Sequence, residues 1–395
     1  MRIAVLGGKL QGVEACYLAK KAGWEVCLAD KNPAAAATGL CDSFVEMDLL
    51  DKDKLTWLLR TVEFVVPALE DRRVLDTIYD CARAAGVRVL YDRDAYRLSA
   101  SKLASDQLFA RLGVPAPRPW PDCRFPVTVK PSGASGSEGV RQVQSPAELN
   151  QFLQSFGRQG EWVIQEFLDG PSYSIEIAGM AGEYRTFQVT ELEMDAGYDC
   201  KRVLAPAILS PDKVQQLADC ALVLARELQL DGIMDIEVIL HDNALKVLEI
   251  DARLPSQTLT AVYHSTGVNV LELLGTGFAA GQQPKVLTTA AARGVVYEHI
   301  RVGGGQIEVC GEHIMGGVGP LFAAADFFGA DEALTNFHPG RQEWVATLIV
   351  TGKTRRQVWQ RRETVIRNIM QACGLAQYLD SAPLPPMGGK EGMVI

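Results

Sequence analysis

Apolar and polar positions in the first 95 residues alternate as strands and helices that follow one another. Short β-branched runs bounded by glycine or polar residues are typical of buried parallel strands, and runs with helical spacing are typical of covering helices. The pattern predicts strands at 3–6, 25–29, 63–68 and 87–91, and helices at 13–22 and 74–85. It therefore predicts an α/β fold that begins with a doubly wound parallel sheet over residues 1–95.

The pattern changes near residue 95 and again near residue 290. Residues 99–102 resemble a helix cap before a predicted helix at 103–112, and four prolines between 115 and 121 predict a stiff connector. A strand that ends in Lys130 precedes a loop at 133–139 that is rich in glycine and serine. Backbone N–H groups of such a loop can surround phosphates, and a flexible linker is the alternative interpretation.

Residues 235–256 form the most informative pattern, a predicted hairpin in which two apolar runs flank the polar turn 241–243. It carries four carboxylates, at Asp235, Glu237, Glu249 and Asp251. Because side chains alternate along a strand, a turn with an odd number of residues, such as three, places all four on one face, whereas an even turn divides them. Opposed carboxylates need a cation, and oxygen ligands suit Mg²⁺. A metal site is predicted, with a solvated acidic face as the alternative.

The last third of the chain is predicted to be rich in strands. After helices at 257–264 and 270–278, strands are expected at 294–300, 306–309 and 343–350, followed by an amphipathic helix at 351–374. The tail after residue 381 is rich in proline and glycine, and we expect it to be frayed.

Composition narrows the classes of function. A length of 395 residues predicts two or three domains, and a net charge of −9 without a basic block argues against nucleic acid or an anionic membrane as a partner. No apolar run reaches membrane-spanning length, and the start of the chain is typical of a first strand rather than of a signal peptide. Nine scattered cysteines without a Cys-x-x-Cys pair predict reduced thiols in a cytoplasmic protein.

The first glycine-rich turn, 7–12, resembles a dinucleotide fingerprint followed by an acid at Asp30, but its spacing is Gly-Gly-x-x-x-Gly. A nicotinamide dehydrogenase rests on this turn and Asp30 alone. A helix N-terminus behind glycines can instead hold another anion, such as a substrate carboxylate. Gln11 and Glu70 lie where open sheets bind ligands, so we expect them to contact a substrate.

Several further residues suit an amino-acid substrate. Glu176, Asp235 and Asp251 can hold ammonium groups, and Ser256 adds a hydroxyl near Arg253. The planar, five-donor guanidinium of Arg253 suits a carboxylate or a developing negative charge, although a salt bridge to a neighbouring acid is the simpler interpretation. A diamino acid needs acids for its amines and a cation for its carboxylate, and the same acids can also be purely structural.

The order and spacing of these residues resemble the ATP-grasp ligases over nearly the whole chain. The marks are Lys102, Lys130, the glycine–serine loop, the sequence Glu166-Phe-Leu-Asp169, and the hairpin with Arg253. Within that family the phrases at 249–257, 200–206 and 7–12 resemble the ligases of pyrrolysine biosynthesis that join 3-methyl-D-ornithine to L-lysine. The resemblance implies a Rossmann-like domain at 1–95, an ATP-grasp domain at 96–288 with a lid at about 117–180, a β-rich C-terminal cap at 289–395, and a possible homodimer.

The resemblance also implies roles for individual residues. Lys130 and Arg253 are the expected catalytic residues, and Mg²⁺ is expected at Glu237 and Glu249, with Asp251 at a position where the family has asparagine. Residues expected to bind ATP are Lys102, Lys130, Ser135, Gly136, Ser137, Glu166, Phe167, Leu168, Asp169 and Ser172. Residues expected to bind the two amino acids are Gln11, Glu70, Ser174, Glu176, Arg202, Asp235, Arg253 and Ser256.

The implied reaction agrees with elementary chemistry. A carboxylate is a poor acyl donor, and its phosphorylation by ATP gives an acyl phosphate that the ε-amine of lysine can attack, releasing ADP and phosphate. The amine has an ordinary pKa near ~10.4 and must first lose a proton, to a group that the sequence does not identify. Alternatives are a bicarbonate-activating carboxylase, another amino-acid ligase and a non-catalytic nucleotide sensor.

Overall fold

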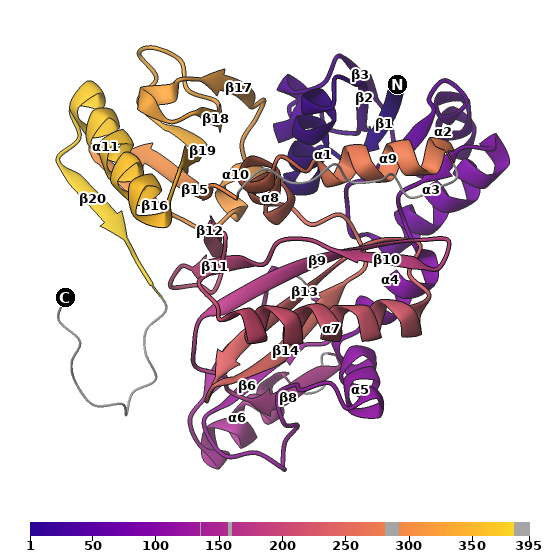
Figure 1. Cartoon of the computed structure of the whole chain (residues 1–395), viewed down its shortest axis with the longest axis vertical. Helices are drawn as coiled ribbons and strands as arrows, with labels where there is room; N and C mark the ends of the chain where they lie inside the picture. Colours follow the sequence, from indigo (N-terminus) through magenta and orange to yellow (C-terminus); the bar gives the residue numbers. More distant parts are fainter. Residues whose placement is uncertain (135, 157–159, 281–291, 383–395) are drawn as a thin grey trace.

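The computed structural model describes residues 1–395 except 135, 157–159, 281–291 and 383–395. Its strands form three sheets (Figure 1), one parallel with five strands, one antiparallel with three and one mainly antiparallel with twelve. No helix within the described ranges is long and apolar enough to cross a membrane. All nine cysteines are free thiols.

The first sheet confirms the predicted doubly wound domain. Its strands are parallel in the order β3-β2-β1-β4-β5. They are β1 (Arg2–Leu6), β2 (Glu25–Asp30), β3 (Ser43–Glu46), β4 (Phe64–Pro67) and β5 (Arg88–Val89). The helices around them are α1 (Leu10–Lys21), η1 (Ala36–Gly39), α2 (Lys52–Leu59) and α3 (Arg72–Ala85). Ile3, Val5 and Leu28 are fully buried, as apolar runs in parallel strands predict.

Packing accounts for the first glycine turn. A Cβ on Gly12 would lie 2.2 Å from the backbone oxygen of Gly7, so no larger residue fits. Asp30 accepts hydrogen bonds from the backbone nitrogens of Gly8 at 2.6 Å and Asn32 at 2.8 Å. The acid that resembled a ribose ligand therefore closes its own turn, which removes the main support for a dehydrogenase.

A helical connector leads from the first domain to the small sheet. It comprises α4 (Arg93–Ser99) and α5 (Lys102–Leu112), and the predicted cap is confirmed because Ser101 accepts a hydrogen bond from the nitrogen of Ala104 at 3.3 Å. The small sheet has the order β7-β6-β8 and packs with α6. These elements are β6 (Val127–Pro131), β7 (Arg141–Val143), α6 (Pro146–Phe156) and β8 (Trp162–Glu166).

The large sheet joins the middle of the chain to its end, in the order β14-β13-β9-β11-β12-β15-β19-β18-β17. Its first strands are β9 (Ser172–Met180), β10 (Glu183–Thr186), β11 (Thr190–Met194), β12 (Cys200–Ala205), β13 (Gly232–His241) and β14 (Ala244–Asp251). Because β9 belongs to this sheet, the small sheet ends earlier than the expected lid boundary near 180. Helix α7 (Pro211–Leu228) covers one face (Figure 1), where Leu217, Leu224 and Ile236 share a core.

The C-terminal part continues the same sheet rather than forming a sheet of its own, because β12 pairs with β15. Its strands are β15 (Gly294–Gly303), β16 (Gln306–Val309), β17 (Phe322–Ala325), β18 (Glu332–Thr335), β19 (Trp344–Gly352) and β20 (Gln377–Asp380). Its helices are α8 (Thr258–Thr266), α9 (Val270–Ala280), α10 (His313–Gly316), η2 (Phe327–Gly329) and α11 (Arg355–Cys373). The predicted last helix therefore starts later than expected, because β19 extends to Gly352. The tail beyond 382 lies outside the described residues.

The hairpin turn corrects the prediction of an odd turn. Only Asp242 and Asn243 lie between the paired residues His241 and Ala244, and both have positive φ, 48° and 60°. An even turn alone would divide the carboxylates between two faces. A β-bulge that inserts Leu248 into β14 restores the pairing, so Glu237 faces Glu249. The turn of three was therefore wrong, while the shared acidic face is present.

Candidate active site

Two adjoining pockets flank the acidic face of the hairpin. The first encloses about 880 Å³, part of it open to solvent, between the small sheet and the large sheet. Of the residues predicted to bind ATP or metal, those that line it are Lys102, Lys130, Ser137, Glu166, Phe167, Leu168, Ser172, Glu237 and Glu249. The apolar side of the pocket includes Val140, Ile239 and Leu248. A pocket with one apolar wall and cations at its end suits a flat ring joined to phosphates.

Two lysines reach the acidic face from different elements. Lys102 opens α5 and lies 3.0 Å from an oxygen of Glu249, while also donating to the backbone oxygen of Ala134 at 2.6 Å. Lys130 lies near the end of β6, is 3% exposed, and donates to the oxygen of the bulged residue Leu248 at 3.3 Å. Burial lowers the pKa of Lys130 even though Glu249 opposes that effect. The bulge therefore fixes the strand register and also presents a carbonyl to Lys130.

The carboxylates stand in two rows across three neighbouring strands. One row contains Asp251, Asp235 and Glu176, and the next contains Glu249, Glu237 and Ser174. Because the apolar residues between them face α7, the acids of the hairpin face the pockets.

The pKa values of the opposed pair Glu237 and Glu249 are shifted in opposite directions. Burial raises the pKa of Glu237 to about 8, and Glu249 adds to the shift. Burial also acts on Glu249, but Lys102 and Lys130 outweigh it and lower the pKa of Glu249. Two facing carboxylates beside lysines form a place where a cation removes a repulsion. Within the described residues no three His, Cys, Asp or Glu side chains converge as a metal site on their own. The pair therefore fits a divalent cation that takes its remaining ligands from phosphate oxygens.

Glu166 is tightly held at the edge of the first pocket. Its carboxylate lies 2.7 Å from the guanidinium of Arg118 and 2.6 Å from the ammonium of Lys246. Burial would raise the pKa of Glu166, but hydrogen bonds from Arg118 and Lys246 lower it to about 2. The side chain thus fixes β8 against the hairpin. Asp169 does not line the pocket, and its main-chain oxygen lies 3.0 Å from Nδ1 of His241.

The second pocket lies against the other end of the acidic face and encloses about 660 Å³, part of it open to solvent. Its described lining contains one arginine, Arg253, and six carboxylates: Asp199, Asp235, Glu237, Glu249, Asp251 and Glu312. Ser256, predicted as a substrate contact, also lines it. Glu237 and Glu249 border both pockets, as do Ser137 and Tyr198. A ligand in the second pocket would therefore meet a ligand of the first at this carboxylate pair.

Arg253 connects the second pocket to the N-terminal domain. Its guanidinium lies 3.1 Å from Asp251, 3.9 Å from Asp235 and 2.9 Å from Glu70. Glu70 in turn accepts a hydrogen bond from Gln11 at 2.9 Å. The predicted residues Gln11 and Glu70 thus reach this pocket through Arg253 rather than by lining it.

Two other predicted residues, Ser174 and Glu176, lie away from both cavities. Ser174 and Glu176 are 1% and 0% exposed and hydrogen-bond each other at 3.1 Å beneath the acidic face. Burial raises the pKa of Glu176 to about 7. Ser135 lies outside the described residues. Gly136 borders the second pocket, and a Cβ there would lie 2.9 Å from the ring of His313.

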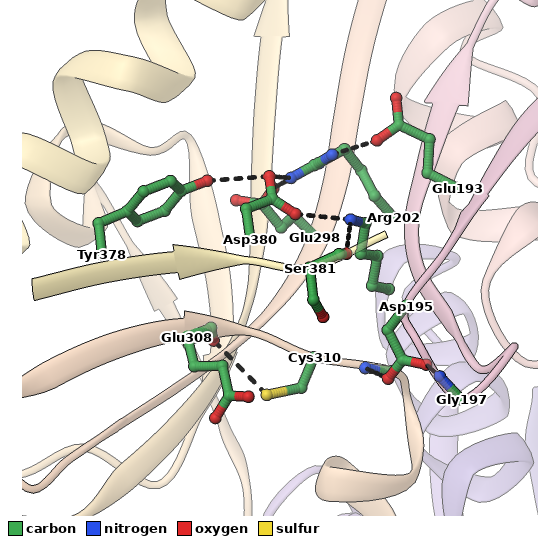
Figure 2. A network of polar contacts seen from close by, with 12 residues as sticks. Glu193, Asp195, Gly197, Arg202, Glu298, Glu308, Cys310, Tyr378, Asp380 and Ser381 are labelled. Carbon is green, nitrogen blue, oxygen red and sulfur yellow. Dashed lines mark hydrogen bonds and ion pairs between the residues drawn. The ribbon is translucent and has the colours of Figure 1, made fainter. Parts of the chain in front are cut away.

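Arg202, expected to contact a substrate, lies instead in a buried ion network and lines neither pocket. Its guanidinium contacts Glu193, Glu298 and Asp380 (Figure 2). Lys201 lies 2.6 Å from Asp380 and also donates to the backbone oxygen of Ser381. Arg202 thus fastens the terminal strand β20 to β12.

Sequence patterns missed residues that come from irregular segments. Tyr198 has positive φ, 64°, and its backbone oxygen accepts a hydrogen bond from Ser137 at 2.7 Å. Asp199 lies 2.8 Å from Nδ1 of His313. Glu312 immediately precedes the four-residue helix α10, which carries no periodic signal. These residues bring the β11–β12 turn, the glycine loop and the C-terminal part together at the second pocket.

Comparisons with known proteins agree with this geometry. A profile of the ATP-grasp domain matches residues 99–257. The 3-methyl-D-ornithine–L-lysine ligase of Methanosarcina barkeri is 35% identical over 79% of this chain and 83% of its own length. The ligase of the same name from Methanosarcina acetivorans is 32% identical over 95% of this chain and 99% of its own length.

A solved structure shows the same fold at low identity. It is the biotin carboxylase domain of the Hydrogenobacter thermophilus 2-oxoglutarate carboxylase, a dimer with MgADP, ADP and bicarbonate. It superposes with a TM-score of 0.70 at 15% identity, over 92% of this chain and 89% of that chain.

Proposed function

The chain belongs to the ATP-grasp family of 3-methyl-D-ornithine–L-lysine ligases, and on this premise we propose that it joins the carboxyl group of (3R)-3-methyl-D-ornithine to the ε-amine of L-lysine. It is an ADP-forming ligase of pyrrolysine biosynthesis. ATP activates the donor as an acyl phosphate, the amine of lysine displaces phosphate, and an amide forms.

One observation carries the proposal: the two pockets meet at Glu237 and Glu249. A nucleotide in the first pocket places its terminal phosphate beside Lys102 and Lys130. An amino acid in the second pocket places its carboxylate toward the same carboxylate pair. Phosphoryl transfer needs such positioning and charge neutralisation rather than covalent help from the protein.

The residues divide the task by their chemistry. Lys102 and Lys130 bind phosphate oxygens, and Arg253 stabilises the charge that develops on the donor carboxyl group. Glu237 and Glu249 would hold Mg²⁺, which would supply positive charge against the phosphates that the donor carboxylate must approach. Asp251 and Asp235 hold ammonium groups of the substrates, which leaves Glu237 and Glu249 as the metal pair.

Electrostatics separates this proposal from bicarbonate activation. A second pocket with six carboxylates and one arginine in its described lining favours molecules with ammonium groups and repels a small anion. Each diamino acid carries two ammonium groups and one carboxylate. The fold that the chain shares with a biotin carboxylase therefore does not bring bicarbonate chemistry with it.

The test is a mass spectrum of the product formed from ATP, Mg²⁺, D-ornithine and L-lysine, with phosphate release measured in parallel. We expect one amide per phosphate released, and no product without lysine. Phosphate release with bicarbonate alone, and none with the two amino acids, would refute the proposal.

Assembly and location are separate expectations. The biotin carboxylase domain named above is a dimer, and we expect a homodimer here, which light scattering of the purified protein will test. A cytoplasmic location agrees with the free thiols, and fractionation of the producing cell will test it.

A further inference from the structure

Glu312 enters the second pocket from the C-terminal part of the chain. Its backbone nitrogen donates to the oxygen of Cys200 at 3.0 Å, which fixes the residue against β12. Its carboxylate accepts a hydrogen bond from the hydroxyl of Ser256 at 2.6 Å. Two contacts from two different segments thus position this carboxylate in the lining of the pocket.

Most other acids of the pocket already have a cationic partner. Glu249 pairs with Lys102, Asp251 and Asp235 pair with Arg253, and Asp199 pairs with His313. Glu237 has none in the described part of the chain, but it faces Glu249 and belongs to the proposed metal pair. Among the described residues, no side-chain nitrogen of Lys, Arg or His lies within 4.0 Å of the carboxylate oxygens of Glu312, so its charge is left for a ligand.

A second observation indicates that the pocket is built for a polar ligand. Asp235 is 6% exposed, and its Oδ1 makes no hydrogen bond within the described residues. The Nε atom of Arg253 is also buried without a hydrogen-bond partner there. Buried polar atoms in folded proteins are nearly always paired, so these two await partners from a substrate.

This inference rests on the proposed function and deepens it. We propose that Glu312 receives the ε-ammonium group of the acceptor lysine and takes its proton. The nitrogen lone pair that is freed attacks the acyl carbon, the bond from that carbon to the phosphate oxygen breaks, and phosphate leaves with the electron pair. The nitrogen gives its second surplus proton to the departing phosphate, which leaves a neutral amide. The proton stays on Glu312 and is released to solvent after the amide departs.

The surroundings of Glu312 suit a proton acceptor. Burial raises the pKa of Glu312 above its ordinary value, with Asp199 adding to the shift, while hydrogen bonds from Ser256 and Gln257 and the charge of Arg253 oppose it. A raised pKa brings a carboxylate closer to the range in which a base works near neutral pH. Other titratable groups near enough to interact with it are Glu14, Cys200, Glu237, Tyr297 and His313.

The test compares two nucleophiles in the variant Glu312→Gln. Hydroxylamine is neutral near pH 7 and needs no proton acceptor, so it traps the acyl phosphate of D-ornithine as a hydroxamate. We expect the variant to form hydroxamate at the wild-type rate and to form the lysine amide about 100- to 10,000-fold more slowly. In the variant the amide rate should rise about tenfold per pH unit toward the pKa of the free amine, ~10.4.

Controls separate the possible failures. Glu308→Gln changes an acid that pairs with Arg301, outside both pockets, and should leave both rates unchanged. Glu312→Asp retains a carboxylate, so its amide rate should fall without gaining the steep rise with pH, which supports the proposal even if Glu312→Gln folds poorly. Equal rates of amide formation in Glu312→Gln and wild type, or a parallel loss of hydroxamate and amide, would overturn it. Absence of hydroxamate from the wild type would instead refute the proposed function itself.

Discussion

Asp380 in the terminal strand completes the charge balance of a buried network, and replacing it with asparagine tests that balance. Three cations, Lys201, Arg202 and Arg362, meet three carboxylates, Glu193, Glu298 and Asp380. Asp380 lies 2.6 Å from Lys201 and 2.7 Å from Arg202. Asparagine keeps the shape of the side chain and removes its charge.

The expected cost follows from burial. Lys201 is 4% exposed and loses its carboxylate partner, whereas Arg202 keeps two others. Removing one partner of a buried pair costs about 3–5 kcal/mol, and since the Asp380 side chain is 22% exposed we expect the lower end, about 3 kcal/mol. With an unfolding entropy of ~2.1 cal/mol/K per residue, a chain that unfolds as one unit would lose about 4 °C in Tm.

The contribution of Asp380 to stability should also depend on pH. Burial would raise the pKa of Asp380, but Arg202 and Lys201 lower it from 3.8 to about 2. A lowered folded-state pKa stabilises the fold fully above the ordinary value, and this contribution is lost as the pH falls from about 4 toward 2. The wild type should lose more stability than Asp380→Asn across that window.

Thermal unfolding followed by circular dichroism is the assay. Asp242→Asn, at a side chain that is 92% exposed, is the matched control and should change stability by less than about 0.5 kcal/mol. Adding Lys201→Met to Asp380→Asn should recover part of the loss, because the unpaired cation is then gone. If Asp380→Asn unfolds at the same temperature as Asp242→Asn and with the same acid dependence, the reasoning about charge compensation is wrong.

Four further predictions concern the pockets. Glu249→Gln should lower phosphate release and leave the circular dichroism spectrum unchanged. Loss of a residue that only supports a metal ligand costs about 10- to 100-fold, and loss of the ligand itself should cost more. Unchanged turnover would exclude the metal pair. Lys130→Met should weaken nucleotide binding measured by calorimetry, and equal affinity would remove Lys130 from the phosphates. Arg253→Lys should slow hydroxamate formation from D-ornithine, because an ammonium cannot replace the planar donor set, and a wild-type rate would contradict that role. Glu166→Gln should flatten the loss of stability between pH 4.5 and about 2, since the lowered pKa of Glu166 stabilises the fold above that window and the contribution disappears within it; an unaltered acid profile would contradict the ion pairs with Arg118 and Lys246.

Regular periodicity made much of the fold predictable. The alternation in 235–251 predicts that Glu237 and Glu249 share one face of the hairpin, and they do. The apolar residues between them pack against α7, so the acids lie on the other face of the sheet. The residue count failed at two places: the turn has two residues rather than three, and nothing in the residues around Leu248 indicates a bulge.

Residues whose positions depend on distant segments could not be predicted in the same way. The resemblance predicts that Arg202 contacts a substrate, but its partners Glu298 and Asp380 are remote in sequence. Glu312 immediately precedes a four-residue helix and reaches the pocket because β12 pairs with β15. Local pattern carries no information about such contacts, since they arise when the large sheet closes.

Whether Glu237 and Glu249 share one face depends on whether the number of residues between them is odd or even. The two turn residues Asp242 and Asn243 and the extra residue Leu248 together supply the odd number that puts Glu249 opposite Glu237. Deleting Leu248, or inserting one residue into the turn, would each send Glu249 and Asp251 toward α7. The two changes made together would cancel, and Glu249 would again lie opposite Glu237. The number of residues between the two carboxylates thus decides which face they occupy, and a turn one residue longer without the bulge would give the same acidic face.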